Sequence, residues 1–182
     1  MNSLHEYLLE SLNDIKDVED FLKNNYNGKW VISKKPNEKG LYEVSAPHSV
    51  ISIKNKNIKS LTNGLFEFTN VGTFECIKCS NLLSLEGSPK EVGTFTCTHC
   101  DSVTDLTGSP EIVKYEFTCK YCNSLKSLIG SPKETEDFFI EYNPNLKDAK
   151  GAPEKVNNFY ARGTGLSKIL IQKFCKAKSI LV

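Results

Sequence analysis

The segment Val-Gly-Thr-Phe-Thr-Cys-Thr-His-Cys-Asp-Ser-Val-Thr-Asp-Leu-Thr-Gly-Ser-Pro spans residues 92–110, and variants of it recur along the chain. One phenylalanine in each copy aligns the set, with successive separations of 21, 22, 21 and 21 residues. These phenylalanines are Phe74, Phe95, Phe117, Phe138 and Phe159. A fixed period of this length is typical of a solenoid, in which each repeat forms one coil and packs against its neighbours.

The repeat follows the pattern V-x-x-F-x-C-x-x-C-x-x-L-x-x-L, which is close to the leucine-rich consensus with one extra residue before the later leucines. The F-x-C part alternates with period two and predicts a short strand whose Phe and first Cys point inward. The second Cys takes the position where an Asn or Cys bonds backbone along the stack, and Asn143 replaces it in the fourth copy. Gly-Ser-Pro or Gly-Ala-Pro then predicts a turn, with no room for a helix between strands.

A degenerate first copy precedes the clear ones. The residues with the repeat spacing are Val50, Ile53, Asn55, Ile58 and Leu61. Ile53 lies 21 residues before Phe74, so we expect it in the phenylalanine position. The sequence thus predicts a mainly β fold, a leucine-rich-repeat solenoid of about six coils with a helix and hairpin cap at its N-terminus and a helical cap at its C-terminus.

The first 49 residues predict a cap, because a solenoid must cover the apolar surface of its end coils. An apolar helical stripe within residues 3–24 consists of Leu4, Leu8, Leu12, Ile15, Phe21 and Leu22. Ser3 and Glu6 have capping-box spacing, and Asn13-Asp14 is expected to divide the segment into two helices. Residues 29–33 and 41–45 alternate like strands and predict a hairpin.

A second cap is predicted over residues 165–182, with a helix over 167–178. Its apolar stripe consists of Leu166, Ile169, Leu170, Phe174 and Ala177, and its solvent-facing lysines are Lys168, Lys173, Lys176 and Lys178. We interpret those lysines as a solvated face, with membrane or nucleic-acid contact as the alternative. The solenoid itself spans residues 50–164, and all three parts are expected to form one continuous structural unit.

Composition restricts the functional classes. The 182 residues are 39% hydrophobic and 25% charged, as in folded proteins, and the formal net charge of +1 gives no field for strong nucleic-acid binding. No secretory signal and no apolar run of membrane-spanning length is visible. We therefore expect a cytoplasmic protein with reduced thiols.

The cysteines allow two interpretations. Six of the seven form three Cys-x-x-Cys pairs, a spacing found in zinc sites. The position of Cys76, Cys97 and Cys119, however, is taken by Ile140 and Ala161 in later copies, which indicates apolar core positions. We favour core packing without a cofactor, and a zinc-dependent nucleic-acid or ribonucleoprotein binder is the alternative.

Two segments carry a resemblance to a known group. Leu-Leu-Ser-Leu-Glu-Gly-Ser-Pro-Lys-Glu-Val-Gly-Thr-Phe-Thr-Cys (residues 82–97) and Ser-Leu-Ile-Gly-Ser-Pro-Lys-Glu (127–134) resemble repeats of leucine-rich proteins of tailed bacteriophages. They are also loosely similar to leucine-rich repeats of secreted bacterial effectors. The resemblance covers residues 50–164. It implies the fold, a phage origin with action in the host bacterial cytoplasm, and no enzymatic activity.

Outward-facing positions of the late repeats suggest where a partner binds. Aromatic and cationic residues gather there, types that are enriched at binding hot spots. The predicted partner-binding residues are Lys120, Tyr121, Phe139, Tyr142, Tyr160 and Arg162. The competing explanation is that the C-terminal helix folds back and covers some of these rings.

The preferred hypothesis is therefore a non-enzymatic module that binds a host protein. Inhibition of a host defence system, such as a CRISPR nuclease, is a role that suits a small phage-encoded binder. A virion structural protein is a further alternative. The sequence contains no phosphate-cradling glycine loop and no His pair with metal spacing. His99 and Cys100 are adjacent on an extended segment, so their side chains are expected to diverge.

Overall fold

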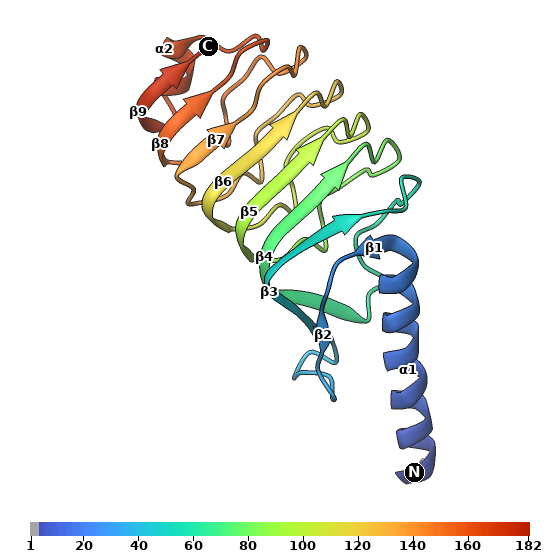
Figure 1. Ribbon diagram of the computed structural model, residues 1–182. Coiled ribbons are helices and arrows are strands. Elements are labelled where there is room, and N and C mark those ends of the chain that lie inside the picture. The colour runs from blue at the N-terminus through green and yellow to red at the C-terminus, as the bar shows by residue number, and fades with distance from the viewer. Residues whose placement is uncertain (1–3) are drawn as a thin grey trace.

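The computed structural model describes the backbone of residues 4–182 and the side chains of residues 14–182. The fold is mainly β, a solenoid of about seven turns with a helix at each end, one turn more than the sequence predicted (Figure 1). The elements in chain order are α1 (Leu4–Asn25), β1 (Tyr26–Asn27), β2 (Val31–Ile32), β3 (Tyr42–Ile53), β4 (Phe66–Ile77), β5 (Glu91–Thr98), β6 (Ile112–Lys120), β7 (Asp137–Phe139), β8 (Lys155–Tyr160), α2 (Lys168–Gln172) and β9 (Lys176–Leu181).

One nine-stranded sheet runs through the whole stack. Strands β3 to β9 pair in sequence order and in parallel, while β1 and β2 pair antiparallel with β3. In Figure 1 the arrows lie side by side and the connecting turns lie on the opposite side of each coil. From β3 to β8 these connections contain turns and no helix, as the repeat predicted. Each coil therefore contributes one strand to the same side of the solenoid.

The phenylalanines form a continuous column inside the stack. Phe74, Phe95 and Phe117 occupy paired positions on β4, β5 and β6, and all three are fully buried. The ring centroids of Phe74 and Phe95 are 6.1 Å apart, and those of Phe95 and Phe117 are 5.2 Å apart. The column continues through Phe138 and Phe159. This arrangement confirms the repeat alignment for the clear copies.

Strand β3 corrects the alignment of the first copy. Ile51, and not Ile53, pairs with Phe74 and fills the phenylalanine position. Irregular pairing between β3 and β4, with register shifts on both sides of Ala46, breaks the simple count of 21 residues. Val50 consequently faces solvent with 49% of its surface exposed, while Ile53 is buried two residues further along the strand. The strand crosses residues 49 and 50, where the predicted cap and solenoid meet.

The C-terminal half of helix α1 packs against the N-terminal end of the stack. It continues through Asn13-Asp14 without interruption, so the prediction of two helices was wrong. Val18 and Leu22 are fully buried against the first coil, and the side chains before residue 14, including the predicted Ser3–Glu6 capping box, lie outside the described residues. Within the described residues no helix combines the length and the apolar character that crossing a membrane requires.

The predicted hairpin is present. Strand β2 lies antiparallel to the first half of β3, with Val31 opposite Ser45 and Ile32 opposite Val44. The loop between them is closed by the Asn37 side chain, whose Oδ1 accepts hydrogen bonds from the backbone amides of Lys39 and Leu41.

The C-terminal cap differs from the prediction. The predicted C-terminal helix is present as α2, but it ends at Gln172 and not at 178, because β9 begins at Lys176 and pairs with β8. Ala177 and Ile180 lie 21 residues after Val156 and Phe159 and pair with them, so the repeat continues for one more strand. Of the predicted apolar stripe, Ile169 is 73% exposed and Phe174 42% exposed. The four predicted solvent-facing lysines are exposed.

Candidate functional site

The outer face of the sheet consists of the side chains that alternate with the buried ones. In β5, Phe95 and Cys97 are fully buried, whereas Thr96 and Thr98 point outward and are partly exposed. On β4 and β5 this face carries mainly small or polar residues. The corresponding positions of β7 and β8 are Phe139 and Tyr160, so the C-terminal half of the face is aromatic.

An apolar stripe crosses the last three strands of the outer face. Phe139 pairs in register with Tyr160, and their rings stack with centroids 4.2 Å apart and planes 7° apart. Tyr160 pairs in turn with Leu181 of β9, which is exposed. The sequence-based prediction missed Leu181 because its segment was expected to follow a helix. Its distance of 21 residues from Tyr160 was the signal that could have identified it.

Lys120 closes one end of this stripe. Its ammonium lies 4.2 Å from the centroid of the Phe139 ring, on the strand next to it, which is a cation–π contact. The same ammonium forms an ion pair of 2.8 Å with Glu141, whose side chain is nearly buried. Lys120 is thereby fixed beside the ring, and its charge is balanced within the chain.

A second row of rings lies just beyond the strand ends. His99, Tyr121 and Tyr142 stack along the solenoid, with centroid distances of 4.8 Å and then 4.7 Å. All three have left-handed backbone conformations, with φ values of 56° to 57°. Lys78 and Gly163 take the same position in the coils before and after them. Left-handed conformations cost a non-glycine residue about 1–2 kcal/mol, which stacking of about 0.5–1.5 kcal/mol per pair partly offsets.

These rings remain accessible. Tyr121 and Tyr142 are 42% and 43% exposed, so the C-terminal cap does not cover them. Helix α2 instead packs on the end of the stack through Ile171, which is fully buried. The suggestion that the C-terminal helix shields these two rings was therefore wrong, because the helix is only five residues long.

Arg162 stands between the two aromatic rows. It follows Tyr160 by two residues on the same outer face and is exposed, and its backbone oxygen accepts a hydrogen bond of 2.7 Å from the amide of Tyr142. Over residues 14–182, the ion pairs of the structure do not include Arg162. Its guanidinium is thus a positive charge without a carboxylate partner in the described part of the chain.

The structure brings the predicted partner-binding residues together on one surface. We call them the aromatic surface, comprising Lys120, Tyr121, Phe139, Tyr142, Tyr160 and Arg162. They form two groups along the outer face, the Lys120–Phe139–Tyr160 stack and the Tyr121–Tyr142 stack. Leu181 and His99 extend these groups at opposite ends.

The inner face carries the cysteines. Six thiols from β4, β5 and β6 and the turns after them form what we call the thiol column: Cys76, Cys79, Cys97, Cys100, Cys119 and Cys122. All six are fully buried in the hydrophobic core. Three of the sulfur atoms, those of Cys97, Cys119 and Cys122, lie within 4.8 Å of one another and could hold a metal ion.

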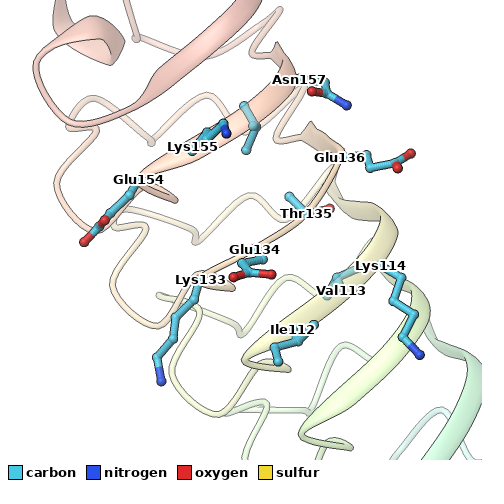
Figure 2. A pocket seen from close by; sticks show the side chains of 11 residues that line it. Ile112, Val113, Lys114, Lys133, Glu134, Thr135, Glu136, Glu154, Lys155 and Asn157 are labelled. Carbon is cyan, nitrogen blue, oxygen red and sulfur yellow. The ribbon is translucent and has the colours of Figure 1, made fainter.

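A shallow hollow of about 670 Å³ lies where β6 and β8 begin. Its rim carries charges of both signs, and Figure 2 shows Lys114, Lys133, Glu136 and Glu154 pointing away from its centre. The Thr135 hydroxyl in its wall is 3.3 Å and 3.1 Å from the backbone oxygens of Tyr115 and Asp137. None of the lining residues is a histidine, cysteine or serine.

Comparison with known proteins returned no match: no family model, no curated protein and no solved structure matches this chain.

Proposed function

We propose that this chain is a non-enzymatic protein-binding module that docks its partner on the aromatic surface. The observation that carries the proposal is the pair of exposed rings, Tyr121 and Tyr142, stacked in left-handed backbone conformations. Gly163 takes the same position in the next coil, so the fold accommodates a residue without a side chain there. Exposed rings at a position that strains the backbone are typical of a surface with a functional role.

The composition of the surface favours a protein partner over a nucleic acid. Both faces of the Phe139 ring are occupied, one by Tyr160 and the other by the Lys120 ammonium. A nucleobase needs a free ring face for stacking, whereas protein hot spots use ring edges, hydroxyl groups and arginine. The formal net charge of +1 also supplies little attraction for a polyanion.

The unpaired guanidinium indicates one property of the partner. Arg162 lies beside Tyr160 and Tyr142, where a docked protein would exclude water from it. A desolvated arginine needs a carboxylate or a set of carbonyl oxygens. We therefore expect the partner to place an acidic side chain between the two aromatic rows.

The biological setting belongs to the proposal as well. The resemblance of the repeats to leucine-rich bacteriophage proteins supports a phage-encoded protein that acts on a host protein in the bacterial cytoplasm. A small rigid surface of this kind suits occlusion of a defence enzyme, such as a CRISPR nuclease.

A pull-down from host lysate, followed by mass spectrometry, would identify the partner. The affinity of the purified partner is then measured for a Tyr142→Ala and Arg162→Ala double variant. We expect a loss of about 30-fold or more, because two hot-spot residues are removed. The melting temperature should fall by only a few degrees, since the loss in the fold is one ring stack.

Ile77→Ala with Lys78→Ala is the matched control. These residues hold the same two register positions in an early coil of the same outer face. Binding should be unchanged in the control. Equal losses in the two double variants, or no loss in the first, would show that the partner does not use the aromatic surface.

A further inference from the structure

The thiol column occupies positions that do not require thiols. The first cysteine position of each coil is filled by Ile140 and Ala161 in the next two coils, and the second by Asn143 and Thr164. Ile140 and Ala161 are buried like the cysteines they replace. The fold therefore accepts larger, smaller and more polar side chains in these positions, yet three consecutive coils use a thiol in both.

The second thiols of the later two pairs donate weak hydrogen bonds to backbone along the stack, as the repeat predicted: Cys100 to the Cys76 oxygen at 3.4 Å and Cys122 to the Cys97 oxygen at 3.7 Å. Asn143 performs that task better, because its Oδ1 accepts from the Cys122 amide at 2.8 Å and its Nδ2 donates to the Cys119 oxygen at 2.9 Å. The contacts of the Cys122 thiol with backbone oxygens are longer, 3.7 Å to that of Cys97 and 3.5 Å to that of Lys120. A thiol is a weak donor, so asparagine is the stronger choice for this contact.

The sulfur positions suit a metal ion. The Sγ atoms of Cys119 and Cys122 are 3.8 Å apart, and that of Cys97 lies within 4.8 Å of both. A three-coordinate ion with metal–sulfur bonds of about 2.3 Å needs sulfur separations of about 4.0 Å. Small adjustments of side chains already in contact would therefore close the site around an ion.

We propose that Cys97, Cys119 and Cys122 bind a thiophilic monovalent ion of the Cu(I) class. Thiolates are the ligands that such soft ions prefer, and these ions accept two or three ligands. Zinc requires four, and the described residues offer only these three mutually close sulfurs, in a site closed to water. This inference is independent of the proposed protein partner, because the thiols lie on the inner face of the sheet.

Binding of the ion is balanced in protons and in electrons. Each thiol that bonds the ion releases its proton to solvent, and neither the sulfur nor the metal changes oxidation state.

The test is an anaerobic titration of reduced, chelator-washed protein with Cu(I), in competition with a Cu(I) chelator of known affinity. We expect one ion per chain, ultraviolet charge-transfer absorption and, by X-ray absorption, only sulfur neighbours. The test variants are Cys119→Ile and Cys122→Asn, which introduce the residues that Ile140 and Asn143 place at the same positions of the next coil. Each should weaken binding at least 100-fold while the circular dichroism spectrum and melting temperature stay close to those of the parent.

Cys79→Asn is the matched control, because it makes the same change at the far end of the thiol column. It should bind Cu(I) like the parent chain. If Cys119→Ile or Cys122→Asn does not fold, Cys97→Ala, which copies Ala161, gives the same comparison. The proposal would be overturned if folded variants at Cys97, Cys119 or Cys122 bind Cu(I) like the parent, or if the parent binds no Cu(I). It would also be overturned if the parent binds four-coordinate zinc that Cu(I) cannot displace.

Discussion

Replacement of Phe95 by alanine tests the packing of the stack where it is most regular. The ring is fully buried and lies between Phe74, 6.1 Å away, and Phe117, 5.2 Å away. Truncation of a buried phenylalanine costs about 3–5 kcal/mol. Two stacked contacts, each about 0.5–1.5 kcal/mol, are lost together, so we expect a value near the upper end of that range.

Urea unfolding followed by circular dichroism measures this loss. Thr96→Ala is the control, because Thr96 is the next residue of β5 but points to the outer face. It should change the free energy of unfolding by about 0.5 kcal/mol or less. In both variants the free energy of unfolding must depend on urea concentration with the same slope as in the parent. A change in this slope would mean that the coils no longer unfold together.

The outcome that refutes this reasoning is specific. A loss below about 1.5 kcal/mol for Phe95→Ala would be that of a partly exposed side chain and not of a ring inside a column. Similar losses for Phe95→Ala and Thr96→Ala would show that the strand does not separate an inner from an outer face.

Three further predictions concern the turns and the buried polar groups. Asn143→Ala should lower the free energy of unfolding in urea by about 1–3 kcal/mol, because the buried Cys122 amide loses its acceptor; a loss below about 0.5 kcal/mol would contradict this account. Gly108→Ala should lower the melting temperature far more than Gly40→Ala. Both glycines have positive φ, but only the methyl group added at position 108 would clash with the Glu86 backbone. Equal shifts of the melting temperature would show that this close approach does not matter. Burial raises the pKa of the Cys175 thiol to about 11 from 9.0, so its contribution to the free energy of unfolding under reducing conditions should be fully present below pH 9 and be lost as the pH rises to 11. Cys175→Ala should make that decrease smaller. An unchanged pH profile of the free energy of unfolding would contradict this prediction.

The sequence predicted the middle of the fold because the repeat is strong there. Phe, Cys and Gly-Ser-Pro recur at fixed distances along the chain. Phe and the first Cys mark the inward positions of each strand and Gly-Ser-Pro marks the turn, so the strand register followed directly. The first copy was misaligned by two residues because irregular pairing beside Ala46 cannot be seen in a one-dimensional pattern. The signal for β9 was present, since Ala177 and Ile180 keep the period, but the helical spacing of nearby apolar residues outweighed it.

The candidate site was predictable in its composition and not in its geometry. Outward positions followed from strand alternation, which placed Phe139 and Tyr160 on one face. The left-handed conformations of Tyr121 and Tyr142 were missed, because tyrosine has no preference for them; Gly163, at the same position of the next repeat, was the signal that could have indicated them. The grouping of three sulfur atoms likewise depends on the offset between adjacent coils, which only the structure supplies.

Site-specific photo-crosslinking tests most directly whether the partner docks on the aromatic surface. A photo-crosslinking amino acid is placed at position 142 or, in a separate variant, at position 78. Tyr142 and Lys78 hold the same left-handed position on the same side of the solenoid, three coils apart. Irradiation of the complex with the identified partner should give a covalent adduct from position 142 and little or none from position 78. Adducts of equal yield from both, or from position 78 alone, would contradict docking on the aromatic surface.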